Sequence, residues 1–201
     1  MRVSKAQMAK NRSRLIAAAG RVMRKRGIAG IGIDTLASAA GMTHGAVYSQ
    51  FAGKDELAAA AITQSLAEST AAWHEAASKA GSPGSPEYFN ELVRHYVSRA
   101  HRDNPQSGCA VAALATDARR HGRRVWRAFS DHVTRLVDDL SAALAESHPD
   151  DEARRDAALV SMASMVGAIM LARAVEDPVL SDRILLTVRR RTTQPLRTRA
   201  I

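Results

Sequence analysis

A glycine between two very short amphipathic segments is the feature that most restricts the fold of this chain. Residues 35–40 and 44–51 each carry apolar side chains at helical spacing, and Gly41 lies between them. Glycine adopts a positive φ without the Cβ clash of other residues, so the first helix can end there. Thr43 is the expected N-cap of the second helix, with its hydroxyl accepting a backbone N–H one turn later. The pattern predicts a helix-turn-helix.

The apolar positions predict how these two helices pack. Leu36, Ala37 and Ala40 share one face of the first helix, and Val47 and Phe51 have i, i+4 spacing in the second. Each helix therefore has an apolar stripe to press on the other. The remaining side chains of the second helix are expected to face outward.

The outward side chains are chemically suited to double-stranded DNA. Short or planar polar groups can hydrogen-bond base edges or phosphates, and an alanine methyl can contact thymine. The base-reading candidates are Thr43, His44, Ala46, Ser49 and Gln50. The phosphate-contact candidates are Thr35, Tyr48 and Lys54, of which Lys54 adds its charge to a helix N-terminus. Each residue alone is more typical of a polar exposed face, whereas the set with its turn spacing favours DNA binding.

Residues 41–57 closely resemble the recognition-helix signature of the TetR family of bacterial transcriptional regulators. Residues 11–33 are similar to the first helix and turn of that family, and Gly108–Ala110 and Leu171–Pro178 are similar to one subgroup. Gly53 departs from the usual serine, and Gln50 stands where histidine or tyrosine is common, which leaves the operator sequence open.

The resemblance implies an all-α fold in two domains with roughly nine helices, which the helical periodicity supports. The expected domains are a three-helix helix-turn-helix DNA-binding domain at residues 1–57 and a helical ligand-binding and dimerisation domain at residues 58–201. Beyond Lys54 we expect helices at residues 54–80, 87–102, 107–120, 123–147, 151–175 and 180–191. The Arg-rich stretch 189–199 is expected to fray.

Positive charge is concentrated at the N-terminal end. The net charge is +9, and residues 1–57 contain ten Lys or Arg against three acids, whereas residues 58–201 contain nineteen against seventeen. Such a surface attracts phosphates, so binding should weaken as salt rises. Residues 1–10 form a basic arm with Arg2, Lys5 and Lys10, ahead of or opening the first helix, and Arg12 and Arg14 continue it. A solvated leader is the alternative.

Two further groups of residues are assigned to ligand binding and dimerisation. Aromatic, Met and Cys side chains at helical spacing are candidates for an inducer cavity, with ordinary core packing as the alternative: Trp73, Phe89, Tyr96, Cys109, Trp126, Phe129, Met162 and Met165. The resemblance implies that the last two helices build a four-helix dimer interface. Its candidates are Met162, Val166, Gly167, Ile169, Met170 and Leu185.

Other functional classes find little support in the sequence. A single cysteine excludes an internal disulfide and suits a reducing cytoplasm, and the histidines lack metal-ligand spacing. The apolar runs 57–62 and 162–172 are shorter than the roughly twenty residues that cross a bilayer, so we expect a soluble protein with no membrane partner. We also expect no metal, no cofactor and no enzymatic activity.

The sequence thus predicts a cytoplasmic, homodimeric regulator, specifically a repressor released from a palindromic operator by a small-molecule inducer. The inducer and the regulated genes are not specified by the sequence. Two alternatives stay open: a basic protein that coats DNA without sequence preference, and a helical enzyme that uses Cys109.

Overall fold

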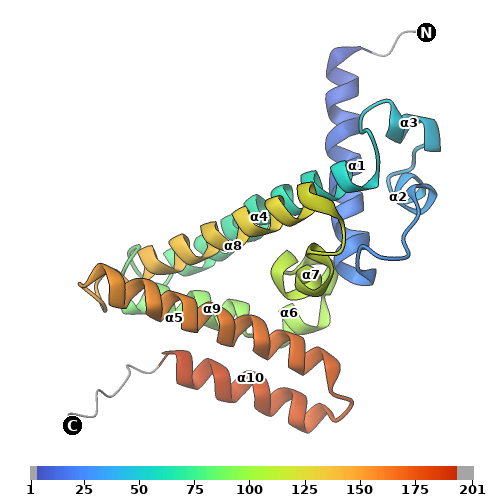
Figure 1. The fold of residues 1–201 in the computed structure, drawn as a ribbon. Coiled ribbons are helices and arrows are strands. Elements are labelled where there is room, and N and C mark those ends of the chain that lie inside the picture. Colours follow the sequence, from blue (N-terminus) through green and yellow to red (C-terminus); the bar gives the residue numbers. More distant parts are fainter. Residues whose placement is uncertain (1–3, 194–201) are drawn as a thin grey trace. The chain divides into compact units, whose positions relative to one another are not determined.

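The computed structural model describes residues 4–193, and within them the chain forms ten α-helices, one 3-10 turn and no strand (Figure 1). Residues 1–3 with Arg2, and residues 194–199 of the Arg-rich stretch, lie outside the described residues. The all-α prediction is confirmed. The helices are α1 (Lys5–Arg26), α2 (Ile33–Ala39), α3 (His44–Tyr48), α4 (Lys54–Ser78), α5 (Pro86–Tyr96), α6 (Arg99–Asp103), α7 (Ala110–Ala118), α8 (Gly122–Ala143), α9 (Asp151–Ala174) and α10 (Pro178–Thr193).

Serine caps account for two of the helix boundaries that differ from the sequence expectation. Helix α1 begins at Lys5 rather than near Asn11, since Ser4 Oγ accepts a hydrogen bond from Gln7 N at 3.2 Å. The helix expected at residues 87–102 is divided into α5 and α6. Ser98 has an extended backbone there, and its Oγ accepts from His101 N at 3.2 Å. This division raises the helix number from the nine expected to ten in the described range.

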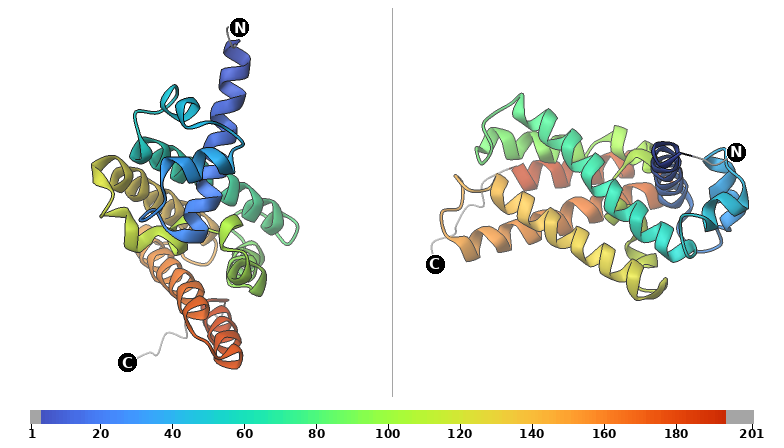
Figure 2. Two further views of the ribbon diagram at one scale, coloured as in Figure 1. Left: turned by 90° about the vertical axis from the view of Figure 1, so that its right-hand side faces the viewer. Right: turned by 90° about the horizontal axis from the view of Figure 1, so that it is seen from above.

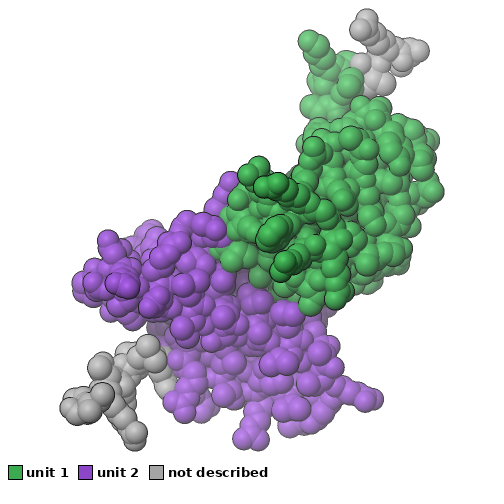
Figure 3. Space-filling view, in the orientation of Figure 1, with its two compact units in different colours: residues 1–69, 105–133 green, residues 70–104, 134–201 purple. Residues whose placement is uncertain are grey.

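The chain separates into two compact units (Figure 3). Unit 1 contains residues 1–69 and 105–133, and unit 2 contains residues 70–104 and 134–201. The unit boundaries fall inside α4 and α8, so these two helices each contribute residues to both units. The segment 1–57, expected to form the DNA-binding domain, lies within unit 1.

Unit 1 has an apolar core to which α1 to α4, α7 and the start of α8 contribute. The predicted stripes are confirmed, because Leu36, Ala37, Ala40, Val47 and Phe51 are all buried in it. Other fully buried members are Leu15, Met23, Ile28, Leu57, Ile62 and Leu114. Burying side chains of this size stabilises the unit by about 1.5–3 kcal/mol each.

Polar contacts also hold the C-terminal end of α1 to the later part of unit 1. The buried guanidinium of Arg24 donates to Gln106 O from Nε at 2.9 Å and from Nη2 at 2.6 Å, and it also donates to Ser65 Oγ. Burial lowers the pKa of Arg24. Asp117 Oδ2 accepts from Ile28 N at 2.6 Å. Residues 105–117 therefore anchor the segment that leads into α2.

Unit 2 is organised around the hairpin of α9 and α10, which pack along each other (Figures 1 and 2). Arg173 on α9 donates to the carbonyls of His101 at 2.6 Å and Arg102 at 3.0 Å. Arg102 in turn pairs with Asp182 on α10 at 2.8 Å. Burial lowers the pKa of His101 to about 4, so this imidazole stays neutral near pH 7.

Candidate functional sites

The helix-turn-helix of unit 1 has the predicted turn. Gly41 has φ +64°, the left-handed conformation expected at the end of the first helix. Thr43 is the N-cap of α3, with an extended backbone at φ −86° and ψ 158°. The predicted hydrogen bond from a backbone N–H to its hydroxyl is absent, however, and the Thr43 side chain is exposed. This cap therefore consists of backbone conformation alone, which leaves the hydroxyl accessible to a bound molecule.

A histidine–aspartate pair lies on the exposed side of the two helices. His44 Nδ1 is 2.5 Å from Asp34 Oδ1, and the two side chains are 55% and 84% exposed. Because a carboxylate only accepts, Nδ1 carries the proton in this contact. The His44 ring also lies 5.1 Å from the Tyr48 ring. Asp34, which is not among the predicted DNA-contacting residues, thus orients one of the predicted base-reading residues.

The other predicted DNA-contacting residues differ in exposure. Thr35, Tyr48 and Ser49 are exposed, and Ser49 Oγ donates to Ala46 O at 2.8 Å. Ala46 and Lys54 are partly buried. Lys54 begins α4 as expected, and its Nζ donates to Ile28 O at 3.1 Å.

Gln50 does not point fully outward as expected. The residue is partly buried, and its Oε1 is buried without a hydrogen-bond partner among the described residues. It directly follows the C-cap of a five-residue helix, where the chain turns back toward the core at Phe51. A base contact by its side chain would therefore need a change of rotamer.

Two arginines assigned to the basic arm instead support the helix-turn-helix. Arg12 Nη1 donates to Gln50 O at 2.6 Å, and its guanidinium lies 3.9 Å from the centre of the Phe51 ring. Arg14 Nη2 donates to Ala40 O at 3.0 Å. Both bonds satisfy carbonyls at the C-terminal ends of the short helices. Lys5 and Lys10 are exposed on the first turns of α1, which project from unit 1 in Figure 2.

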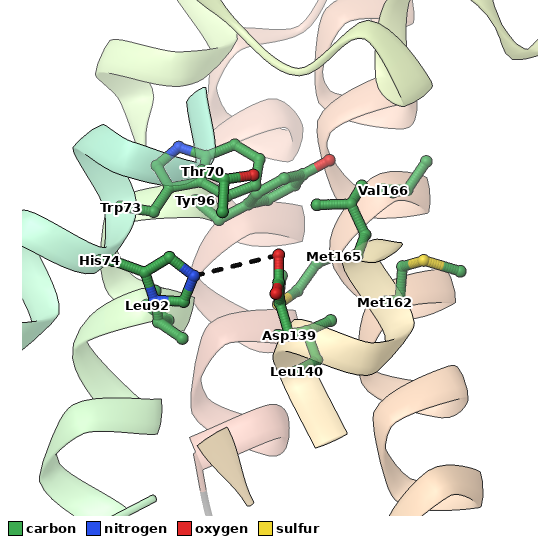
Figure 4. Close-up of a pocket in the computed structure, with 11 residues that line it drawn as sticks. Thr70, Trp73, His74, Leu92, Tyr96, Asp139, Leu140, Met162, Met165 and Val166 are labelled. Carbon is green, nitrogen blue, oxygen red and sulfur yellow. Dashed lines mark ion pairs between the residues drawn. The ribbon is translucent and has the colours of Figure 1, made fainter. Parts of the chain in front are cut away.

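A cavity with an empty volume of about 450 Å³, part of it open to solvent, lies in unit 2 (Figure 4). Trp73 and Tyr96 form an edge-to-face pair in its wall, with ring centres 5.0 Å apart. Helices α4, α5, α8 and α9 supply the lining residues. These are Thr70, Trp73, His74, Leu92, Tyr96, Leu136, Asp139, Leu140, Met162, Met165 and Val166.

Only half of the side chains predicted for the ligand cavity line it: Trp73, Tyr96, Met162 and Met165. Phe89 is buried in unit 2 but is not among the lining residues. The other three belong to unit 1, where Cys109 is fully buried, Phe129 packs against the core and Trp126 is 48% exposed. Helical spacing marks an apolar face, yet it does not tell which partner covers that face.

The polar side chains of the cavity were not predicted. His74 Nε2 lies 4.0 Å from Asp139 Oδ2, and the two side chains are 34% and 40% exposed. His74 Nδ1 makes a hydrogen bond with Tyr88 OH. Burial raises the pKa of Asp139, while the charge of His74 acts in the opposite direction. Sequence spacing could not reveal this group, because α4, α5 and α8 each contribute one member.

Helix α9 has a second, outward apolar face. Leu159, Val160 and Leu171 are exposed, and Val160 is 65% exposed. At 100° per residue these three share an arc of about 120° with Ala163, Gly167 and Met170. A Cβ added at Gly167 would meet nothing within 4 Å. Helix α10 adds exposed Val179, Leu180 and Leu186.

The structure places the predicted dimer-interface residues in different surroundings. Gly167 and Met170 lie on the outward face of α9, whereas Ile169 and Leu185 are buried inside unit 2. Met162 and Val166 line the cavity instead. The predicted set therefore combines residues of the outward face of α9, of the cavity wall and of the interior of unit 2.

Helix α9 is also longer than the apolar runs counted in the sequence. Its 24 residues, Asp151–Ala174, are sufficient in length and composition to cross a membrane, and 33% of its most apolar window is buried in the structure. One such helix is weak support for a membrane protein, since core and interface helices have the same composition. Among residues 4–193, no group of three or more His, Cys, Asp or Glu could hold a metal ion.

Comparison with known proteins identifies two matching segments. Residues 15–61 match the model for bacterial regulatory proteins of the tetR family. Residues 86–180 match the model for the C-terminal domain of LmrA/YxaF-like transcriptional regulators. No curated protein gives a match.

Solved structures show the same fold over nearly the whole chain. A TetR-family transcriptional regulator from Agrobacterium tumefaciens is 20% identical with a TM-score of 0.74, covering 92% of this chain and 98% of its own. One from Cytophaga hutchinsonii is 19% identical with a TM-score of 0.74, covering 94% and 96%. One from Streptomyces coelicolor is 24% identical with a TM-score of 0.66, covering 96% and 98%.

Proposed function

The chain belongs to the TetR family of DNA-binding transcriptional regulators, and we propose that it acts in the cytoplasm as a homodimeric repressor released from a palindromic operator by a small-molecule inducer. The observation that carries this proposal is the exposed polar face of α2 and α3, held on the buried core of unit 1. The dimer and the inducer each rest on a separate feature, and the repressor role is tested by experiment.

The proposed base-reading surface consists of the exposed residues of α3 and its caps. Thr43, His44 and Ser49 are exposed and carry hydrogen-bonding groups that match base edges. Tyr48 OH and Thr35 Oγ1 are proposed to contact phosphates. Lys54 adds positive charge at the N-terminus of α4, where the helix dipole also attracts phosphate. Ala46 and Gln50 are assigned a smaller part because they are partly buried.

The proposed dimer interface is the outward apolar face of α9 and α10. Several large apolar side chains exposed on two packed helices are typical of an interaction surface, and a second copy of the same face would cover them with twofold symmetry. Gly167 would permit close approach of two α9 helices, since no atom of its own chain occupies the space beside it. A twofold dimer presents two α3 helices, which explains why the operator should be palindromic.

The proposed inducer site is the cavity of unit 2, and α4 is the proposed connection to the DNA-binding segment. Helix α4 runs without interruption from Lys54 to Ser78. Its later turns contribute Thr70, Trp73 and His74 to the cavity. An inducer that binds better when these turns are displaced shifts the population away from the DNA-competent state.

Selection of bound duplexes from a random pool at about physiological salt tests this proposal. We expect enrichment of one palindromic motif, and reporter expression from that motif should rise when the gene for this protein is deleted. Enrichment without a palindrome would argue against the dimer. Binding without any enrichment would favour the DNA-coating alternative, and a fall in reporter expression on deletion would identify an activator.

A further inference from the structure

The lining of the unit 2 cavity indicates which chemical class of ligand it binds, which the proposed regulation by an inducer does not specify. Eight of its eleven lining residues are aliphatic, aromatic or Met side chains. The other three are Thr70, His74 and Asp139, so the lining contains one carboxylate and neither lysine nor arginine. Asp139 is therefore the one acidic group in this wall, and no basic Lys or Arg side chain of the lining offsets its charge.

The Asp139 carboxylate has unused capacity for a positively charged partner. Its contact with His74 Nε2 is 4.0 Å, beyond hydrogen-bond distance, and no described side chain or backbone group donates a hydrogen bond to it. Figure 4 shows the carboxylate among the lining side chains, with His74 on one side and Met162 and Met165 on the other. Asp139 is also partly exposed, so a ligand can reach it from solvent.

The remaining wall suits the body of an organic cation. The ring faces of Trp73 and Tyr96 attract positive charge through their quadrupoles. The polarisable sulfurs of Met162 and Met165 adapt to the shape of an aromatic or aliphatic group. Thr70 Oγ1 is buried in the wall without a hydrogen-bond partner among residues 4–193, so it can accept an N–H from a protonated amine.

We propose that this cavity binds a lipophilic organic cation, with the positive charge beside Asp139 and the apolar body between the aromatic pair and the two methionines. The inference rests on the proposed function only in treating this cation as the inducer. Binding itself does not depend on DNA. Neutral ligands of the same shape lose the Asp139 attraction, and anionic ligands are repelled by it.

Three probes of nearly equal size separate charge from shape. They are the 10-methylacridinium cation, neutral 9-methylanthracene and the 9-anthracenecarboxylate anion. Binding is measured without DNA by quenching of Trp73 fluorescence in a Trp126→Phe background, which leaves Trp73 as the single tryptophan of the chain. Trp126 lies in unit 1 and does not line the cavity.

We expect the cation to bind about tenfold more tightly than the neutral probe, and the anion to bind more weakly than both. Asp139→Asn should remove the advantage of the cation and leave the neutral probe unchanged. The matched control is Asp138→Asn, which removes the adjacent carboxylate, an exposed group that pairs with Arg155 at 2.8 Å and does not line the cavity. This control should retain the cation preference.

Equal binding of cation and neutral probe by the unsubstituted Asp139 protein would overturn the proposal. So would preference for the anion, failure of all three probes to bind, or an Asp139→Asn protein that keeps the cation preference. None of these results bears on duplex selection, so the ligand class can fail while the DNA-binding regulator stands. If the cation binds as expected but does not release operator DNA, the inducer assignment fails and the ligand class stands.

Discussion

Two histidine–aspartate pairs, one in each unit, have the same chemistry in opposite environments. In unit 1 His44 and Asp34 are in direct contact at 2.5 Å, and both side chains are more than half exposed. In unit 2 His74 and Asp139 are 4.0 Å apart in the wall of a mostly apolar cavity. An exposed pair adds little stability, because water screens the attraction, but it can orient a ring. A partly buried, loosely paired carboxylate can instead attract a ligand.

The largest predicted effect is that a substitution in unit 2 weakens DNA binding, which is assigned to unit 1. Leu171→Asp changes only unit 2, yet it should weaken operator binding at least about a hundredfold, since a charge in the apolar face of α9 prevents dimerisation. Operator titration together with sedimentation measures both properties. The control is Ala72→Asp, which places the same charge at an exposed position of α4. Strong operator binding by a monomeric Leu171→Asp protein would contradict the dimer.

The second-largest predicted effect concerns His44 of the exposed His44–Asp34 pair. His44→Ala should cost about 1–3 kcal/mol of operator affinity and relax preference at one base pair of each half-site. By contrast Tyr48→Phe, which removes one phosphate-contacting hydroxyl, should weaken binding on all sequences alike. Competition titrations against a panel of single-base operator variants separate these results. Identical behaviour of the two variants would refute the division of roles within α3.

A smaller effect is expected from the residue that orients His44. Asp34→Asn should reduce operator affinity about two- to fivefold. The reason is that an exposed charged contact contributes at most about 1 kcal/mol. The same variant in a His44→Ala background should have no further effect. A double-mutant cycle on operator affinity checks this coupling. Additive losses would show that Asp34 acts independently of His44.

The smallest effect concerns the stability of the cavity pair. Because burial raises the pKa of Asp139 in the folded state, ionisation there opposes folding, and its cost appears as pH rises from the unfolded pKa through the folded pKa. Asp139→Asn should therefore gain stability relative to the parent at neutral pH and lose this gain in acid. Urea unfolding between pH 3 and pH 7 measures it. Asp34→Asn, at the exposed pair, should change stability by within about 0.5 kcal/mol throughout.

The helix-turn-helix of α2 and α3 shows what local sequence can determine. Gly41 and the stripes of Leu36 and Val47 act over a few residues, so the turn and the packing of α2 on α3 follow from spacing alone. The contacts of Arg12 and Arg14 with carbonyls on these helices span 38 and 26 residues, and no local pattern indicates them. The Asp34–His44 contact spans only ten residues, but it crosses the turn between two helices, so helical spacing does not indicate it either.

The cavity of unit 2 shows what local sequence cannot determine. Its His74–Asp139 pair joins α4 to α8, and its apolar wall comes from four helices. Spacing correctly marks Met162 and Met165 as members of an apolar face, but only the three-dimensional fold separates them from the outward face of α9 that contains Val160 and Leu171. Trp126 was assigned to a cavity for the same reason, although it is exposed in unit 1.

The central claim is that two copies of this chain read one palindrome. The most direct test is titration of the selected operator at about physiological salt, with affinity and stoichiometry measured together, against a duplex in which one half-site is scrambled. We predict two chains per operator and an affinity at least about a hundredfold weaker on the scrambled duplex. One chain per duplex, with equal affinity for both, would contradict it.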